Sequence, residues 1–105
     1  MAKYFFLGSY TSEGAAGLLS GNSNRKAAIE ALTQSVGATL ISVDITRGQY
    51  DACVVIEADS FDIAGAVALK VRASGAMDDL IILEALDIEK IAKAGASINY
   101  IPPGG

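Results

Sequence analysis

The chain contains no histidine, no tryptophan and a single cysteine. Histidine is the commonest ligand for transition metals and the usual proton carrier near neutral pH, so its absence removes the ordinary zinc and copper sites. It also removes catalytic triads that need an imidazole, and haem ligation through histidine. Any acid–base chemistry would depend on Asp, Glu, Lys, Tyr or water. We predict no bound metal and no other cofactor.

The only cysteine, Cys53, cannot form an internal disulfide, which is typical of a reducing compartment. Its apolar neighbours Ala52, Val54 and Val55 favour a buried thiol that behaves as a small hydrophobic group. The first apolar run ends near Ser9 after about five residues, whereas a secretory signal needs roughly 7–15. No run approaches the ~18 apolar residues of a membrane span. We expect a cytoplasmic protein with no membrane partner.

Basic residues are few: eight Lys and Arg stand against twelve Asp and Glu, for a net charge of −4. A protein that binds nucleic acid needs clustered Lys and Arg to neutralise phosphates, and here they are scattered. RNA-binding sheets also set their aromatic residues in a basic surround, which Arg47 alone does not supply. The glycines of "GSYTSEGAAG" lack the spacing of a phosphate loop. We expect no nucleic-acid partner and no nucleotide site.

Hydrophobic periodicity predicts one domain over residues 1–105 in which strands and helices alternate. Ser12 is a candidate cap for a short helical turn, and Asp59 or Ser60 and Asp87 are candidate caps for later helices. Glycines at 37, 75 and 95 are expected to end helices. The pattern predicts strands over 3–10, 38–46, 50–57 and 76–86, helices over 24–36, 58–75 and 87–95, a loop over 20–24, a hairpin turn over 47–49 and an extended tail over 98–105.

The predicted order of elements is the split βαβ pattern of ferredoxin-like folds. We therefore expect an α+β, βαββαβ fold: an antiparallel four-stranded sheet with two helices on one face, a short C-terminal helix and an extended tail. The other sheet face is expected to stay bare and to carry Tyr4 or Phe6, and Leu80 or Ile82. With 51% hydrophobic residues in 105, such a face predicts an interaction surface. The expected partner is a second copy, in a homodimer or higher homo-oligomer.

Three acidic and aromatic side chains around the predicted hairpin are candidate ligand-binding residues. Asp51 follows the turn: a partly desolvated carboxylate there would have a raised pKa and act as a base. The structural alternative is that Asp51 accepts hydrogen bonds from backbone amides of its own turn. Tyr50, and Tyr10 at the end of the first strand, are suited to hydrogen-bonding a ligand or to filling an interface.

Asp44 is the fourth candidate. It shares the less apolar face of its strand with Ser42, so it either lines the cavity of a paired barrel or is a solvated charge at a sheet edge. The adjacent acids Asp78 and Asp79 point to opposite strand faces and cannot chelate one ion together. We assign no catalytic residue and no metal ligand from the sequence.

Four separated stretches, "YFFLGSYTSEG", "GQYDACVVIEA", "ALKVRASGAM" and "YIPPGG", resemble the GYD-domain proteins. The family's Gly-x-Tyr-Asp element would be Gly48, Tyr50 and Asp51. The resemblance implies a ferredoxin-like chain of the dimeric α/β-barrel type, a group that includes cofactor-independent monooxygenases, muconolactone isomerase-like enzymes and haem-dependent enzymes. The haem branch uses an axial histidine that this chain lacks, and no catalytic set transfers residue by residue.

Two classes of function stay open on this evidence. The first is a small homo-oligomer that binds a small molecule, as a binder or as a cofactor-independent monooxygenase- or isomerase-like enzyme. Such an enzyme would transfer a proton or insert oxygen into an activated compound. The second is a non-enzymatic assembly or regulatory module whose oligomer is itself the function. A closed apolar cavity with converging polar groups would favour the first class.

Overall fold

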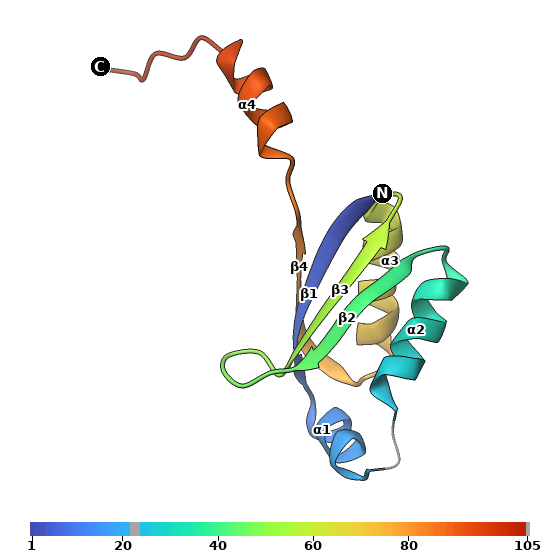
Figure 1. Ribbon diagram of the computed structural model, residues 1–105. Coiled ribbons are helices and arrows are strands. Elements are labelled where there is room, and N and C mark those ends of the chain that lie inside the picture. The colour runs from blue at the N-terminus through green and yellow to red at the C-terminus, as the bar shows by residue number, and fades with distance from the viewer. Residues whose placement is uncertain (22–23, 105) are drawn as a thin grey trace.

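The computed structural model describes residues 1–21 and 24–104. Residues 22–23 of the predicted loop and Gly105 of the predicted tail lie outside them. Within the described residues the order of elements is that expected, and the short helical turn expected after the first strand is a helix of eight residues (Figure 1). The elements are β1 (Ala2–Tyr10), α1 (Ser12–Leu19), α2 (Arg25–Ser35), β2 (Thr39–Ile45), β3 (Ala52–Ala58), α3 (Phe61–Ala73), β4 (Met77–Glu84) and α4 (Ile88–Ala96).

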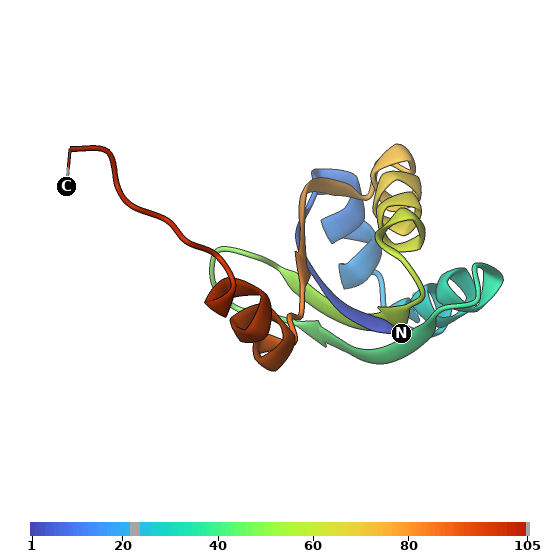
Figure 2. The same ribbon diagram turned by 90° about the horizontal axis from the view of Figure 1, so that it is seen from above.

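The strands form one antiparallel sheet in the order β2-β3-β1-β4. Helices α2 and α3 lie on the same face of this sheet (Figure 2). The predicted α+β, ferredoxin-like fold is therefore confirmed. A hairpin connects β2 and β3 as predicted, and Gly48 in its loop has a φ of 135°, which only glycine adopts readily. The loop covers residues 46–51, longer than the predicted 47–49, so β3 begins at Ala52 and not at residue 50.

Register decides which apolar side chains of β1 meet the helices. Tyr4 pairs with Ile56 and Phe6 with Val54, and all four belong to the cluster between sheet and helices or pack against it. The expectation that Tyr4 or Phe6 lies on the bare face was wrong, and so was the parallel expectation for Leu80 or Ile82. Both faces of these strands are apolar, so composition alone could not tell which alternating set the helices cover.

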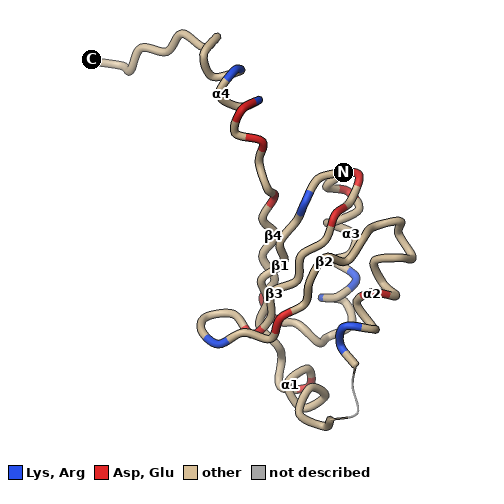
Figure 3. Tube along the Cα trace, in the orientation of Figure 1, with Lys and Arg blue, Asp and Glu red and all other residues tan. Residues whose placement is uncertain are grey.

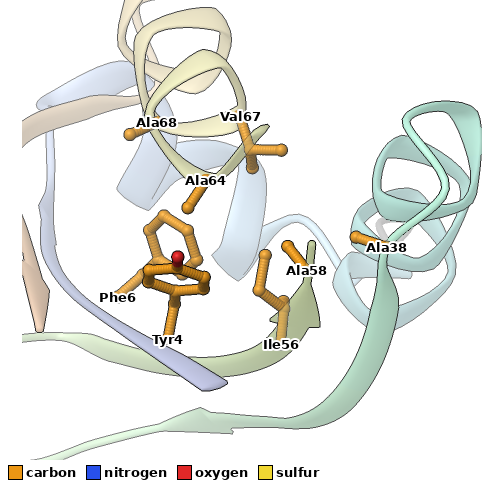
Figure 4. Close-up of a cluster of buried hydrophobic side chains, with 8 residues drawn as sticks. All are labelled: Tyr4, Phe6, Ala38, Ile56, Ala58, Ala64, Val67 and Ala68. Atoms are coloured by element: carbon orange, nitrogen blue, oxygen red, sulfur yellow. The ribbon is translucent and has the colours of Figure 1, made fainter. Parts of the chain in front are cut away.

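Small residues on α3 let that helix approach the aromatic rings of β1 closely. Ala64 and Ala68 lie over Tyr4 and Phe6 in Figure 4. Tyr4 is only 1% exposed and Ile56 is fully buried, so these side chains form the centre of the core. Burying groups of this size contributes roughly 1.5–3 kcal/mol each.

The bare face, called here the open face, carries the other alternating set. Its apolar members are Phe5 and Leu7 from β1, Val55 from β3, and Ile81 and Leu83 from β4, because these residues are opposite one another in the register. Directly opposed residues of an antiparallel pair point to the same side of the sheet. Leu83 is 51% exposed. An apolar face thus exists as expected, but with different residues.

A register shift in β2 alters the predicted alternation of that strand. The shift falls between Leu40 and Ser42, and it places Leu40 opposite Ile56 on the helix side. Strict alternation along the strand predicts Leu40 on the face of Ser42 and Asp44 instead, and that expectation is wrong. A bulge adds one residue to one strand, and strict alternation cannot anticipate it.

Two predicted helix boundaries and one predicted cap hydrogen bond also differ. Thr11, not Ser12, caps α1, because its side chain accepts the Gly14 amide at 3.1 Å. No side-chain cap hydrogen bond forms at Ser60, the N-cap of α3. Gly95 does not end α4, which runs to Ala96. The cap at Asp87 and the stops at Gly37 and Gly75, both with positive φ, are as predicted.

The last twenty described residues leave the domain. We call residues 85–104 the arm: they comprise α4 with its flanking segments, and α4 has no buried residue. In Figure 1 the arm extends past the end of the sheet. The radius of gyration is 17.4 Å, with extents of 58 × 32 × 22 Å, whereas a compact domain of this length has about 13 Å.

Candidate functional site

The two main helices diverge over the sheet and leave an apolar pocket between them. Helix α2 packs over β2, while α3 packs over β4 and β3. The space between them, over the middle strands, has a volume of about 350 Å³, within the usual range for small-molecule sites. We call it the helix-side pocket. Its lining includes Phe6, Val54, Leu32, Val67, Val71 and Leu80.

Small residues keep this pocket open at its floor. Gly8 of β1 and Ala52 of β3 are direct partners in the register, and both line the pocket. A Cβ at Gly8 would collide with the side chains of Met77 and Leu80. The sequence thus places its smallest residues where the two middle strands meet the cavity.

Arg25 supplies a cation at one wall of this apolar space. Its Nη2 donates to the Gly14 carbonyl at 3.0 Å, and its guanidinium carbon lies 5.4 Å from the centroid of the Tyr10 ring. Its Nε is buried and has no hydrogen-bond partner. Among the described residues no carboxylate forms an ion pair with it. A buried charged donor left unsatisfied is costly, so a rearrangement of the Arg25 side chain that gives its Nε an acceptor would be favourable.

Two caps hold Arg25 in this position. Asn24 begins α2, its Oδ1 accepting the Ala27 amide at 3.0 Å, so Arg25 is the first helical residue. Helix α1, which supplies the Gly14 carbonyl, is fixed through Thr11: its amide donates to the Ala76 carbonyl at 3.0 Å and its hydroxyl to the Gly75 carbonyl at 2.7 Å.

A smaller hollow adjoins the pocket on the side of α1. It has a volume of about 210 Å³ and shares Arg25, Ser74 and Ala76 with the helix-side pocket. Glu13 lines the hollow but not the pocket. The charged residues that line the pocket itself are Arg25 and Lys70, both cations. The electrostatic environment of the pocket therefore favours a negative group.

The structure brings Tyr10 and Asp51 together. Tyr10 lines the pocket. Asp51 Oδ2 accepts the Tyr10 backbone amide at 3.0 Å, and the Asp51 amide donates to the Gly8 carbonyl at 2.8 Å. The structural alternative for Asp51 assumed amides of its own turn, whereas the amide it binds belongs to a strand 41 residues away. The carboxylate extends the pairing of β1 with the hairpin beyond the last paired residues of β3.

The other two predicted residues lie elsewhere. Asp44 is exposed on edge strand β2, opposite Cys53 and on the open face. Tyr50 belongs to the hairpin loop, where its carbonyl accepts the Thr46 hydroxyl at 2.5 Å. Neither lines the helix-side pocket. Cys53 was expected to be buried but is only partly so, because its strand position points to the open face.

Sequence reasoning missed Arg25, which it counted among scattered charges. A signal was present: residues 25, 28, 29 and 32 have the i, i+3, i+4, i+7 spacing of one helix face, and the last three are apolar. A single cation that continues an apolar stripe indicates a charge directed toward the interior. Acidic and basic residues are otherwise dispersed along the chain (Figure 3).

Residues 1–21 and 24–104 show neither a metal cluster nor a membrane-spanning helix. No group of three or more Cys, Asp or Glu side chains in this part of the chain is arranged to hold a metal ion. None of its helices is long and apolar enough to cross a bilayer.

Comparison with known proteins identifies the family. No curated protein matches the sequence. Solved structures share the fold at low identity. FFRP-DM1 has a TM-score of 0.53 at 17% identity, covering 82% of this chain and 100% of its own. TTHA0845 from Thermus thermophilus has a TM-score of 0.54 at 15% identity, covering 83% and 95%.

The hypothetical protein PHS023 from Pyrococcus horikoshii has a TM-score of 0.52 at 15% identity, covering 83% of this chain and 92% of its own. At such identities these likenesses show the fold alone. The GYD domain, in contrast, matches by sequence over residues 4–97, nearly the whole chain, and includes the Gly48, Tyr50 and Asp51 element. The chain therefore belongs to the GYD domain family.

Proposed function

We propose that this protein binds a small organic anion, with an apolar body in the helix-side pocket and a carboxylate or similar oxyanion on Arg25. The observation that carries the proposal is the buried Arg25 Nε without a hydrogen-bond partner, in a pocket whose other lining is mainly apolar. A ligand carboxylate would bind the guanidinium through a charge-assisted hydrogen bond, and a small shift of the Arg25 side chain would bring the buried Nε within its reach. The apolar lining would bind the rest of the molecule.

Binding is favoured over catalysis by the chemistry of the lining. The described residues around the pocket include no carboxylate and no thiol, so a strong general base is lacking there. Proton transfer or oxygen insertion would depend on Tyr10 or Lys70, the remaining titratable groups. The monooxygenase- or isomerase-like activity implied by the wider fold group is thus the weaker form of this proposal.

The test compares two probes of equal shape and different charge, 2-naphthoate and 2-naphthamide. Isothermal titration calorimetry of the full chain should show that 2-naphthoate binds more tightly than 2-naphthamide. The Arg25→Gln variant should weaken 2-naphthoate binding by about tenfold or more, because a hydrogen bond to a charged group contributes about 1.5–3 kcal/mol. It should leave 2-naphthamide binding within about twofold.

The matched control is Arg47→Gln, which removes the same charge from the exposed hairpin. The net charge changes equally in both variants, so only the position differs. Arg47→Gln should change neither affinity, because Arg47 does not line the pocket. Equal effects of the two substitutions, or equal binding of the two probes by the unaltered chain, would contradict the proposal.

A second candidate, assembly, is supported by the open face. Apolar side chains from three strands are grouped there, and no described helix covers them: Leu83 is exposed, Phe5, Leu7 and Ile81 are partly exposed, and Val55 is buried among its neighbours. Monomeric proteins rarely expose apolar patches of more than a few hundred Å². We propose that a second copy covers this face by a two-fold contact of sheet on sheet, and that the expected homodimer forms in this way. Sedimentation at micromolar concentration should then give a dimer, and a monomer would contradict it.

A further inference from the structure

We propose that the arm, residues 85–104, packs on the open face of a second copy, so that two chains exchange their C-terminal helices. The proposal rests on the self-association proposed above and adds a specific occupant for part of that face. Three observations support it: the apolar open face, the exposed apolar side of α4, and the direction in which the arm leaves the sheet.

The arm carries a helix that is well specified by sequence yet unsupported by its own domain. Asp87 caps α4, its Oδ1 accepting the amides of Glu89 at 3.1 Å and Lys90 at 3.3 Å. Helix α4 has only nine residues. Isolated helices shorter than about 12–15 residues are marginal in water, so this one requires a packing surface.

One side of α4 is suited to such packing. Ile88, Ile91 and Ala92 follow the i, i+3, i+4 spacing of one helix face, whereas Lys90 and Lys93 lie on the other. Ile88 is 69% exposed and Ile91 43% exposed. The flanking segments continue this apolar character with further exposed side chains, namely Leu86, Ile98, Tyr100 and Ile101.

The arm does not reach the open face of its own chain. The Ala85 amide still donates to the Lys3 carbonyl at 2.9 Å, which fixes the root of the arm at the end of β1. From there α4 continues past the sheet (Figure 1) and lies on the side of β4 away from α3 (Figure 2). A partner that places its sheet against the open face therefore comes within reach of the arm, and two-fold symmetry gives each copy the same contact.

Cys53 provides a direct test because it is the only cysteine and lies on the open face. One chain would carry Cys53→Ser with Ala92→Cys, on the apolar side of α4. It would be mixed with a ¹⁵N-labelled chain of unaltered sequence, and treated with a short thiol cross-linker. Mass spectrometry should find position 92 of the unlabelled chain joined to Cys53 of the labelled chain.

The control moves the thiol to the polar side of the same helix, as Lys93→Cys with Cys53→Ser. Its yield of mixed cross-link should be at least fivefold lower. A third chain, Ala92→Cys with Cys53 retained, detects an arm that folds back. A predominant intrachain link would overturn the exchange, and so would a dimer in sedimentation that gives no mixed link. A monomer in sedimentation would overturn self-association itself.

A second measurement does not depend on cross-linking. The double substitution Ile88→Gln/Ile91→Gln removes the apolar side of α4, and Lys90→Gln/Lys93→Gln alters the polar side with similar helix propensity. The first should weaken dimerisation by about tenfold or more, because the apolar area of two Ile side chains would no longer be buried against the partner. The second should stay within about twofold. Equal dimerisation of the two variants would overturn the proposal.

Discussion

The two faces of the sheet are built from alternating residues of the same strands, yet they differ in what covers them. On the helix side, Tyr4, Phe6 and Ile56 are buried, and the divergence of α2 and α3 leaves the helix-side pocket. On the open side, Phe5 and Leu7 are apolar as well, but no described helix covers them. Apolar composition therefore predicts that these side chains are buried, whereas the strand register decides whether helices or another surface bury them.

The basic residues on the two sides of the sheet also lie in different surroundings. Arg25 on the helix side is partly buried, and one of its nitrogens lacks a partner. On the open side, Lys3 is exposed and lies opposite Glu57 across β1 and β3. A charge beside an opposite charge in water contributes little, while an unsatisfied buried donor favours a ligand. This is why the binding proposal concerns the helix side and the assembly proposal the open side.

The largest expected effect is a difference in stability loss between substitutions on the two faces of β1. Phe6→Ala should lower the free energy of unfolding by about 3–5 kcal/mol, because it leaves a cavity in the core. Phe5→Ala, one residue earlier, should lower the free energy of unfolding of the monomer by clearly less. Chemical denaturation at low concentration measures both. Equal losses would show that the two faces are not distinct in the folded chain.

The next effect concerns the end of the sheet where Tyr10 enters the pocket. Asp51→Ala should destabilise the fold by about 1–3 kcal/mol, because the Tyr10 amide loses its acceptor. Asp51→Asn should cost much less, since the amide oxygen can accept the same hydrogen bond. Denaturation curves of both variants provide the measurement. If the two variants lost equal stability, the hydrogen bond to Tyr10 would not be the role of Asp51.

The smallest effect is a pH dependence on the helix side. Burial raises the pKa of the Tyr4 hydroxyl, and the negative charges of Glu84 and Asp62 raise it further. The folded state therefore favours the neutral phenol, so this contribution to stability is complete below the unfolded pKa of about 10 and is lost as the pH rises through the folded value. Chemical denaturation between about pH 8 and pH 11 measures how the free energy of unfolding falls as the pH rises. This fall should be shallower in Tyr4→Phe. An unchanged decline would exclude Tyr4 as its source.

Much of the fold could be predicted from the sequence, since its signals are local. The apolar run of β3, the small residues of α3 and the cap at Asp87 each specify one element through neighbours in the chain. The side of β1 that meets the helices could not be predicted, because Tyr4 and Phe6 are no more apolar than Phe5 and Leu7. That choice depends on how distant strands pair.

The site was predictable only in part for the same reason. Tyr10 was selected for its chemistry and does line the pocket, and Asp51 lies beside it. The pocket itself arises where α2 and α3 diverge, which is a property of packing rather than of any motif. Arg25 contacts Gly14 and Tyr10 from a different helix, and only its place on an apolar stripe was visible in the sequence. The roles of Asp44 and Tyr50 in binding stay predictions.

The most direct test of the difference between the two faces is to locate a bound probe. Intermolecular nuclear Overhauser effects would be measured between 2-naphthoate and the methyl groups of the full chain. We expect contacts with Val54 and Val67, which line the helix-side pocket, and none with Val55 and Ile81. Contacts confined to Val55 and Ile81 would contradict it, because the anion would then occupy the open face.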